Sequence, residues 1–202
     1  MVNNIFKYRF YYDWWKNLDK PIFATIMLLY SLGLFFSLVS TSLIASDKLD
    51  TNSYYFFFKH FFFIIIGFFC IIFFSALDKK NLYRVSIISF FIFFVFLVLV
   101  PIIGVEIKGS KRWLDFLFFP RFQPIELLKP FIIIIIALIL ESEKNNNIYY
   151  KYLLSFIVIV PVIFLLISQP DIGQTLLVFL AWLSLIFISG INLLFFFLFF
   201  TL

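Results

Sequence analysis

Long apolar segments follow one another along this chain of 202 residues, with only short polar stretches between them. Hydrophobic residues make up 64% of the sequence and charged residues only 13%. A soluble fold of this length cannot bury so much apolar surface. About 20 apolar residues are enough for a helix to cross the hydrocarbon core of a bilayer, where a helix satisfies all of its own backbone groups. We therefore predict an all-α, polytopic integral membrane protein.

The apolar segments predict about six complete transmembrane helices in a single transmembrane domain over residues 1–202. They cover residues 21–43, 57–77, 85–103, 124–140, 152–167 and 172–188. A last apolar run of 11 residues, 192–202, is too short to cross a bilayer, so we interpret it as a truncated seventh helix. We expect the chain to be the N-terminal portion of a longer protein.

Lysine and arginine placement indicates the orientation, because cytoplasmic loops carry an excess of these residues. If the polar, basic tail at residues 1–20 is cytoplasmic, nine basic residues lie inside and seven outside. Five of the outer seven lie between residues 106 and 129, and without them the balance is nine against two. We predict a cytoplasmic N-terminus and an extracytoplasmic loop over residues 104–123.

The segment from Glu106 to Lys129 holds eight of the 27 charged residues of the chain. Its sequence is EIKGSKRWLDFLFFPRFQPIELLK, and long apolar runs flank it on both sides. Its cations lie on the side of the membrane where topology disfavours positive charge. A specific anionic partner explains them better than orientation does.

Two proline motifs mark the starts of predicted helices that enter the membrane from the same outer side. Pro124 follows Gln123 and suits the first helical position, and Glu126 favours the positive end of that helix. Gln169-Pro170-Asp171 repeats the arrangement at the sixth predicted helix. We expect both helix starts to converge with the basic loop on one site in the outer leaflet.

Two features of this region leave alternatives open. Lys129 lies three residues after Glu126 on one helical face, so the two form either a self-satisfied pair or part of a functional intramembrane cluster. Trp113 suits the membrane interface. Beside Lys111 and Arg112 it also resembles a loop that grips a phosphate with cations while the indole packs on a lipid or sugar. We therefore favour a phosphate-bearing lipid as the ligand.

Several other chemistries have no support in the sequence. His60 and Cys70 are the single histidine and cysteine, so neither a disulfide nor a metal site is expected. No Gly-rich phosphate loop, nucleophile elbow or dinucleotide fingerprint is present. The net charge of +5 comes from residues that flank predicted helices, so we expect no nucleic-acid partner. We predict no cofactor within these residues, and dependence on a divalent cation stays open.

Three patches of the chain resemble the SEDS family of bacterial envelope synthesis, which includes FtsW, RodA and SpoVE. They are KGSKRW at residues 108–113, FQPIELLK at residues 122–129 and QPDIGQT at residues 169–175, in the family's order and at its helix positions. The sequence GVEIKG at residues 104–109 is more similar to FtsW than to RodA. Ile125 replaces the usual serine, and the family's glycine after the tryptophan is missing near Leu117 and Phe118.

This resemblance implies about ten spans, of which the chain covers the N-terminal half or slightly more. It also implies a glycosyltransferase that polymerises lipid II and releases undecaprenyl pyrophosphate at the outer face of the bacterial inner membrane. The expected catalytic aspartate lies beyond Leu202, so the fragment is expected to be inactive alone. The expected substrate-binding residues are Lys108, Lys111, Arg112, Trp113, Gln123, Glu126, Lys129, Gln169 and Asp171.

The partners that the resemblance implies are a class B penicillin-binding protein, other divisome membrane proteins and membrane lipids, with location at the division septum. An elongation role stays open beside division. Two further hypotheses are a flippase for a lipid-linked precursor, since a charged cavity between proline-kinked helices would suit it, and a non-catalytic divisome scaffold.

Overall fold

The computed structural model describes residues 14–16, 18–49, 54–107, 109–116, 119–142 and 147–190. Most of the predicted N-terminal tail and the run at 192–202, with its predicted seventh helix, lie outside this part. The chain divides into two compact units, Met1–Asp78 and Lys79–Leu202.

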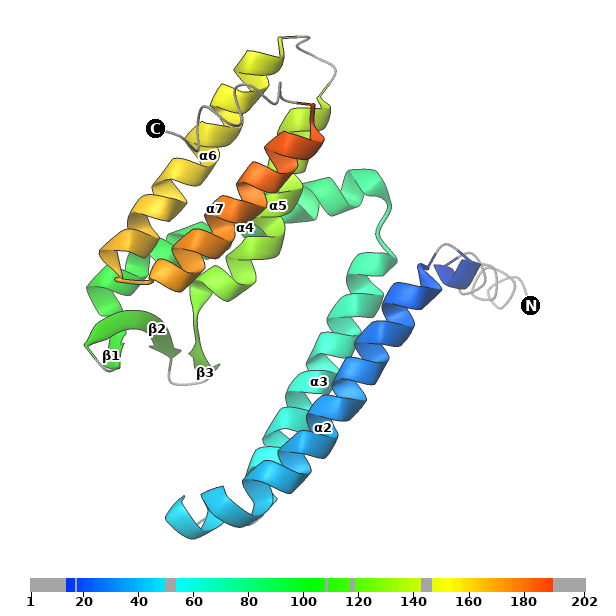
Figure 1. Ribbon diagram of the computed structural model, residues 1–202, viewed down its shortest axis with the longest axis vertical. Coiled ribbons are helices and arrows are strands. Elements are labelled where there is room, and N and C mark those ends of the chain that lie inside the picture. Colours follow the sequence, from blue (N-terminus) through cyan, green and yellow to red (C-terminus); the bar gives the residue numbers. More distant parts are fainter. Residues whose placement is uncertain are drawn as a thin grey trace. The chain divides into compact units, whose positions relative to one another are not determined.

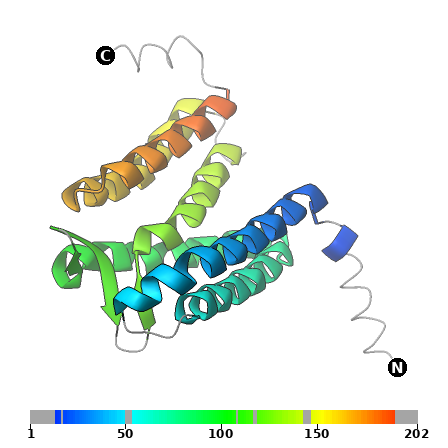
Figure 2. The same cartoon turned by 60° about the horizontal axis from the view of Figure 1, so that its bottom comes forward.

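The first unit is a helical hairpin. Helices α2 (Lys20–Leu49) and α3 (Tyr55–Ser75) lie side by side in Figures 1 and 2. They approach closely where Gly67 faces Tyr30, because a Cβ on this glycine would lie 2.7 Å from the tyrosine hydroxyl. Large apolar side chains point outward, as at Phe69, which is 65% exposed. Such a surface is typical of helices that face lipid.

The second unit packs four helices around one apolar core. They are α4 (Lys79–Ile103), α5 (Pro124–Glu141), α6 (Ile148–Ser168) and α7 (Ile172–Ile188). Each helix buries a stripe of residues spaced three or four apart, the spacing of one helical face. The fully or nearly buried members include Leu97 and Val100 on α4, Leu128, Ile132 and Ile136 on α5, Ile159, Val162 and Leu166 on α6, and Val178, Trp182 and Ile186 on α7. Figure 1 shows α6 and α7 running alongside each other.

The predicted outer loop folds into a small antiparallel sheet between α4 and α5. Its strands are β1 (Val105–Ile107), β2 (Ser110–Phe116) and β3 (Phe119–Phe122), in the order β1-β2-β3. Gly104 separates α4 from β1, and any Cβ there would lie 2.3 Å from the Val100 carbonyl oxygen. Gly109 in the β1–β2 turn has φ +79°, which favours glycine.

Aromatic rings attach this sheet to α4. The ring of Phe96 lies 6.1 Å from that of Phe116 on β2 and 6.0 Å from that of Phe122 on β3, between centroids. Leu114 on β2, which pairs with Phe122, is buried. Aromatic contacts of this kind add to the stability that burial provides. The sheet is therefore held at the end of the helices where α5 and α7 begin.

Each of the six described helices α2–α7 overlaps one predicted segment, and α2, α4 and α6 are longer than predicted. The helical, multi-pass membrane architecture is confirmed. Four described helical segments are long and apolar enough to cross a membrane, namely Lys20–Val39, Phe56–Ser75, Lys79–Ile103 and Ile148–Ser168. Helix α5 carries three charged residues in 18 positions, and α7 has 17 residues. The exact number of spans therefore stays a prediction. The sheet was not predicted.

Candidate functional site

Arg112 is aimed at the α6–α7 turn by an irregularity in its strand. Val105 pairs with Trp113 and Glu106 with Lys111, so Arg112 is an extra residue on β2 opposite the β1 ladder. Such a β-bulge bends the strand and redirects a side chain.

The Arg112 guanidinium binds the end of α6 and the start of α7 together. Its Nε donates to the carbonyl oxygen of Gln169 at 3.4 Å, and Nη2 donates to that of Pro170. Its Nη1 lies 3.5 Å from Oδ1 of Asp171. A cation favours the carbonyl end of a helix, so this contact also stabilises α6.

Asp171 is the N-cap of α7 and a centre of the site. Its side chain is 7% exposed, and its Oδ1 accepts from the backbone N–H of Gln174 at 3.5 Å. Its Oδ2 accepts from Nε2 of Gln123 at 2.8 Å. Gln123 is itself the N-cap residue of α5, which begins at Pro124. The starts of α5 and α7 are thus joined through one carboxylate.

Gln174 joins this carboxylate to a second pair of charges. Its Nε2 donates to Oε1 of Glu126 at 2.7 Å, and its Oε1 accepts from Nζ of Lys129 at 3.0 Å. Lys129 Nζ also lies 2.7 Å from Oε2 of Glu126. The Lys129 side chain is 17% exposed and that of Glu126 49%. The Gln174 amide thus donates to the carboxylate and accepts from the ammonium, and these two bonds fix its orientation.

Six of the predicted site residues therefore lie in one connected polar cluster, which we call the outer polar network after its predicted side of the membrane. Its members are Arg112, Gln123, Glu126, Lys129, Gln169 and Asp171, with Gln174 as an added member. Gln169 is 3% exposed and its Nε2 donates to the Leu97 carbonyl oxygen at 3.4 Å, which ties the turn to α4. The predicted convergence of the two helix starts with the basic loop is present in the structure.

The other three predicted site residues, Lys108, Lys111 and Trp113, are not among the members of the outer polar network. Lys111 is exposed and Trp113 half-buried on β2, beside Arg112. Lys108 lies outside the described residues. Lys111 has Glu106 opposite it on β1. Ligand contact stays a prediction for all nine predicted site residues.

Two details at the helix starts differ from the sequence-based expectation. Pro170 lies in the turn before the N-cap, and α7 begins at Ile172, so the capping is done by the Asp171 side chain. The second detail concerns Glu126, which was expected to act on the positive end of its helix. Its carboxylate instead binds the side chains of Gln174 and Lys129, because these reach it from the facing helix and the next turn.

Gln174 is the network residue that sequence reasoning missed. The available signal was its position three residues after Asp171, the spacing of a capping box. In the structure its side chain does not turn back to the N-cap but crosses to α5. Only the packing of α7 against α5 reveals this role.

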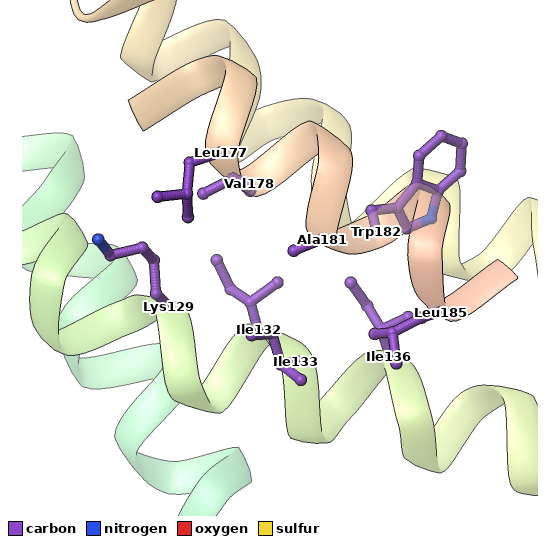
Figure 3. Close-up of a pocket in the computed structure, with 9 residues that line it drawn as sticks. All are labelled: Lys129, Ile132, Ile133, Ile136, Leu177, Val178, Ala181, Trp182 and Leu185. Atoms are coloured by element: carbon purple, nitrogen blue, oxygen red, sulfur yellow. The ribbon is translucent and has the colours of Figure 1, made fainter. Parts of the chain in front are cut away.

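A narrow apolar groove between α5 and α7 begins at the outer polar network. Figure 3 shows Lys129 at one end of a row of α5 side chains that faces α7. The groove has a free volume of about 10 Å³, about that needed for one water molecule. The two helices therefore pack closely below the network. The lining residues are Lys129, Ile132, Ile133, Ile136, Leu177, Val178, Ala181, Trp182 and Leu185.

The chemistry available in the outer polar network is that of charge and hydrogen bonding. Two cations, Arg112 and Lys129, are balanced by two carboxylates, Asp171 and Glu126. Among the described residues, no three of His, Cys, Asp or Glu lie together as metal ligands would. The hydrogen-bond donors of the network are already oriented, an arrangement that suits an anionic group.

The regions that match curated relatives make up most of this chain but less than half of each relative. A probable peptidoglycan glycosyltransferase FtsW from Caulobacter vibrioides is 27% identical over 178 residues, which are 88% of this chain and 45% of the relative. A protein of the same name from Nitrosomonas europaea is 31% identical over 187 residues, 89% of this chain and 47% of the relative. The chain thus spans a little under half the length of the curated relatives it matches.

Solved structures share the fold. The crystal structure of the rod shape determining protein RodA from Thermus thermophilus superposes with a TM-score of 0.61 at 24% identity, covering 79% of this chain and 54% of RodA. A chain in a structure described as a peptidoglycan synthase complex that coordinates polymerization and crosslinking gives 0.59, also at 24% identity, covering 79% of this chain and 47% of that one.

The family model of the FtsW, RodA and SpoVE cell cycle proteins matches residues 19–202. This match includes both helical units and every residue of the outer polar network. The relatives named FtsW agree with the sequence at residues 104–109, which is more similar to FtsW than to RodA. The chain belongs to the FtsW/RodA/SpoVE family of cell cycle proteins.

Proposed function

We propose that this chain is the N-terminal part of a peptidoglycan glycosyltransferase that polymerises lipid II at the outer face of the bacterial inner membrane. The names of the curated relatives support the activity. The observation that carries the proposal is the outer polar network, in which one set of hydrogen bonds joins β2, α5 and α7 at a single end of the second unit.

In this proposal the network holds the pyrophosphate of a lipid-linked sugar. The reaction joins a sugar hydroxyl of one substrate to the anomeric carbon of another, and the leaving pyrophosphate needs positive charge to stabilise it. Lys111 and Arg112 supply that charge, and Trp113 packs on lipid or sugar. Glu126 and Asp171 orient the cations. The proton-abstracting aspartate is expected in a part of the protein beyond residue 202.

Lys129 has the deeper position in the same site. It lies one helical turn below Glu126 and begins the apolar groove between α5 and α7. A charged side chain at that depth is costly unless it has partners, and here it has two. Its place suits the phosphate nearer to the polyprenyl chain.

The proposed partner is a class B penicillin-binding protein, with other divisome membrane proteins at the septum and the N-terminus in the cytoplasm. The structural neighbour described as a peptidoglycan synthase complex supports this partnership, and the relatives named FtsW support the septum.

The test is lipid II polymerisation by the full-length protein with its penicillin-binding partner. We expect Arg112→Ala and Trp113→Ala to lower glycan synthesis at least tenfold while membrane insertion stays intact. Arg121→Ala is the matched control, since Arg121 lies in the same sheet but pairs with Asp115, outside the network. Unchanged glycan synthesis in both the Arg112 and Trp113 variants would refute the proposed site.

A further inference from the structure

A second charged cluster lies at the opposite end of the second unit. Glu141, the last residue of α5, pairs with Lys79 and accepts from the hydroxyl of Tyr83 at 2.9 Å. Glu126 of the outer polar network lies 15 residues earlier on the same helix, about 22 Å away along its axis. This cluster is therefore distinct from the proposed substrate site.

The described residues at this end include four cations, Lys79, Lys80, Arg84 and Lys151, against two carboxylates, Glu141 and Asp78. Lys79 is neutralised by Glu141, whereas Lys151 donates to the neutral carbonyl oxygen of Leu140 at 3.2 Å and keeps its charge. Lys80 and Arg84 are exposed, and neither takes part in an ion pair among the described residues.

Lys80 and Arg84 begin a continuous stripe along α4. They are four residues apart, so they occupy one helical face. The same face continues with exposed apolar residues, Ile88 at 60%, Phe91 at 61% and Val95 at 54% exposed. All five positions fall within about 80° of the helix circumference at 100° per residue.

The length of this stripe matches one leaflet of a bilayer. From Arg84 to Val95 the helix rises about 16 Å, and half of the hydrocarbon core is about 15 Å thick. Exposed tyrosines at the start of α6, Tyr149 at 67% and Tyr150 at 45%, mark the same end as a membrane–water interface. A cationic pair therefore lies at headgroup level, directly above an apolar track for an acyl chain.

We propose that Lys80 and Arg84 bind the phosphate of an anionic phospholipid, whose acyl chain lies along Ile88, Phe91 and Val95. This inference does not rest on the proposed enzymatic function. Two donors one turn apart can contact one phosphate, and the partner is a lipid because only a lipid combines that phosphate with a chain of leaflet length.

The test places a bimane fluorophore beside the stripe, at Ile92→Cys in the full-length protein with Cys70→Ser and any other cysteine replaced. Vesicles of dioleoylphosphatidylcholine contain rising fractions of brominated phosphatidylglycerol or brominated phosphatidylcholine, which quench the fluorophore on contact. We expect phosphatidylglycerol to bind more than tenfold more tightly. Lys80→Gln and Arg84→Gln should each lower this preference about fivefold, since each cation near the surface contributes about 1 kcal/mol.

Three comparisons make the result decisive. Lys80→Arg with Arg84→Lys keeps both charges and should keep the preference, and 0.5 M salt should weaken it in the unchanged protein. Lys16→Gln with Lys20→Gln removes two exposed cations from the other unit and should leave it unchanged. Equal quenching by both lipids, a retained preference in Lys80→Gln with Arg84→Gln, or an equal loss in the Lys16 and Lys20 control would overturn the proposal.

Discussion

Replacing Asp171 by alanine should lower the free energy of unfolding by about 3 kcal/mol. The substitution removes the N-cap of α7, which contributes about 1 kcal/mol. It also removes the acceptor for Gln123, a hydrogen bond to a charged group that contributes about 1.5 kcal/mol. The pair with Arg112 adds less than about 1 kcal/mol, because its 3.5 Å separation and the 34% exposed guanidinium weaken it.

Asparagine at the same position separates these contributions. It caps helices as well as aspartate does, so Asp171→Asn keeps the bond to the Gln174 N–H. It loses the charge that faces Arg112, and its amide N–H₂ meets the donor of Gln123. Only the cap is kept, so we expect a loss of about 2 kcal/mol, roughly 1 kcal/mol less than for alanine.

The measurement is unfolding of the full-length protein in mixed micelles with rising sodium dodecyl sulfate, followed by circular dichroism. Asp115→Ala is the control, because Asp115 pairs with Arg121 on an exposed part of the β-sheet, outside the outer polar network. This substitution should cost less than about 1 kcal/mol. The reasoning is refuted if Asp171→Ala costs no more than Asp115→Ala, or if asparagine is as costly as alanine.

Two further predictions concern Gln174, in the outer polar network, and Glu141, at the opposite end of α5. Gln174→Leu should cost about 2 kcal/mol in the same titration, because it removes two hydrogen bonds to charged groups. An unchanged free energy of unfolding would show that the Gln174 amide does not stabilise the fold through Glu126 and Lys129. Lys79, with Tyr83, holds the pKa of Glu141 below its ordinary value of 4.5, so this carboxylate contributes stability above about pH 4.5 that is lost as the pH falls through the lowered pKa. Glu141→Gln should therefore melt slightly below the unchanged protein at pH 7, and this difference in melting temperature should shrink as the pH falls below 4.5. A difference that does not shrink as the pH falls contradicts the ion pair as its cause.

The helices could be predicted from the sequence because a bilayer imposes a simple length rule. Each of the six apolar segments became a helix, and Pro124 marked the start of α5 as its fixed φ implies. The convergence of Glu126, Asp171 and the basic loop also followed from topology alone, since counting spans placed all three on one side.

The sheet and its bulge could not be predicted in the same way. The segment from Val105 to Phe122 has charged and aromatic residues without a clear alternation, so its pairing depends on the rings of Phe96, Phe116 and Phe122 meeting in three dimensions. The direction of the Arg112 side chain depends on the extra residue in β2, which no spacing in the sequence reveals. Gln174 was missed for a similar reason, because its partners lie on another helix.

The charge balance of the outer polar network has a consequence for the proposed reaction. If Arg112 and Lys129 lacked their carboxylates, the empty site would hold two poorly solvated cations at the membrane surface, and a pyrophosphate product would leave slowly. Asp171 and Glu126 make the empty site neutral, so an incoming pyrophosphate gains only the difference between its own contacts and those it replaces. Neutralising Glu126 should then tighten product binding while slowing its release. In the proposed reaction the two carboxylates therefore act on turnover through the cations, as positioning residues.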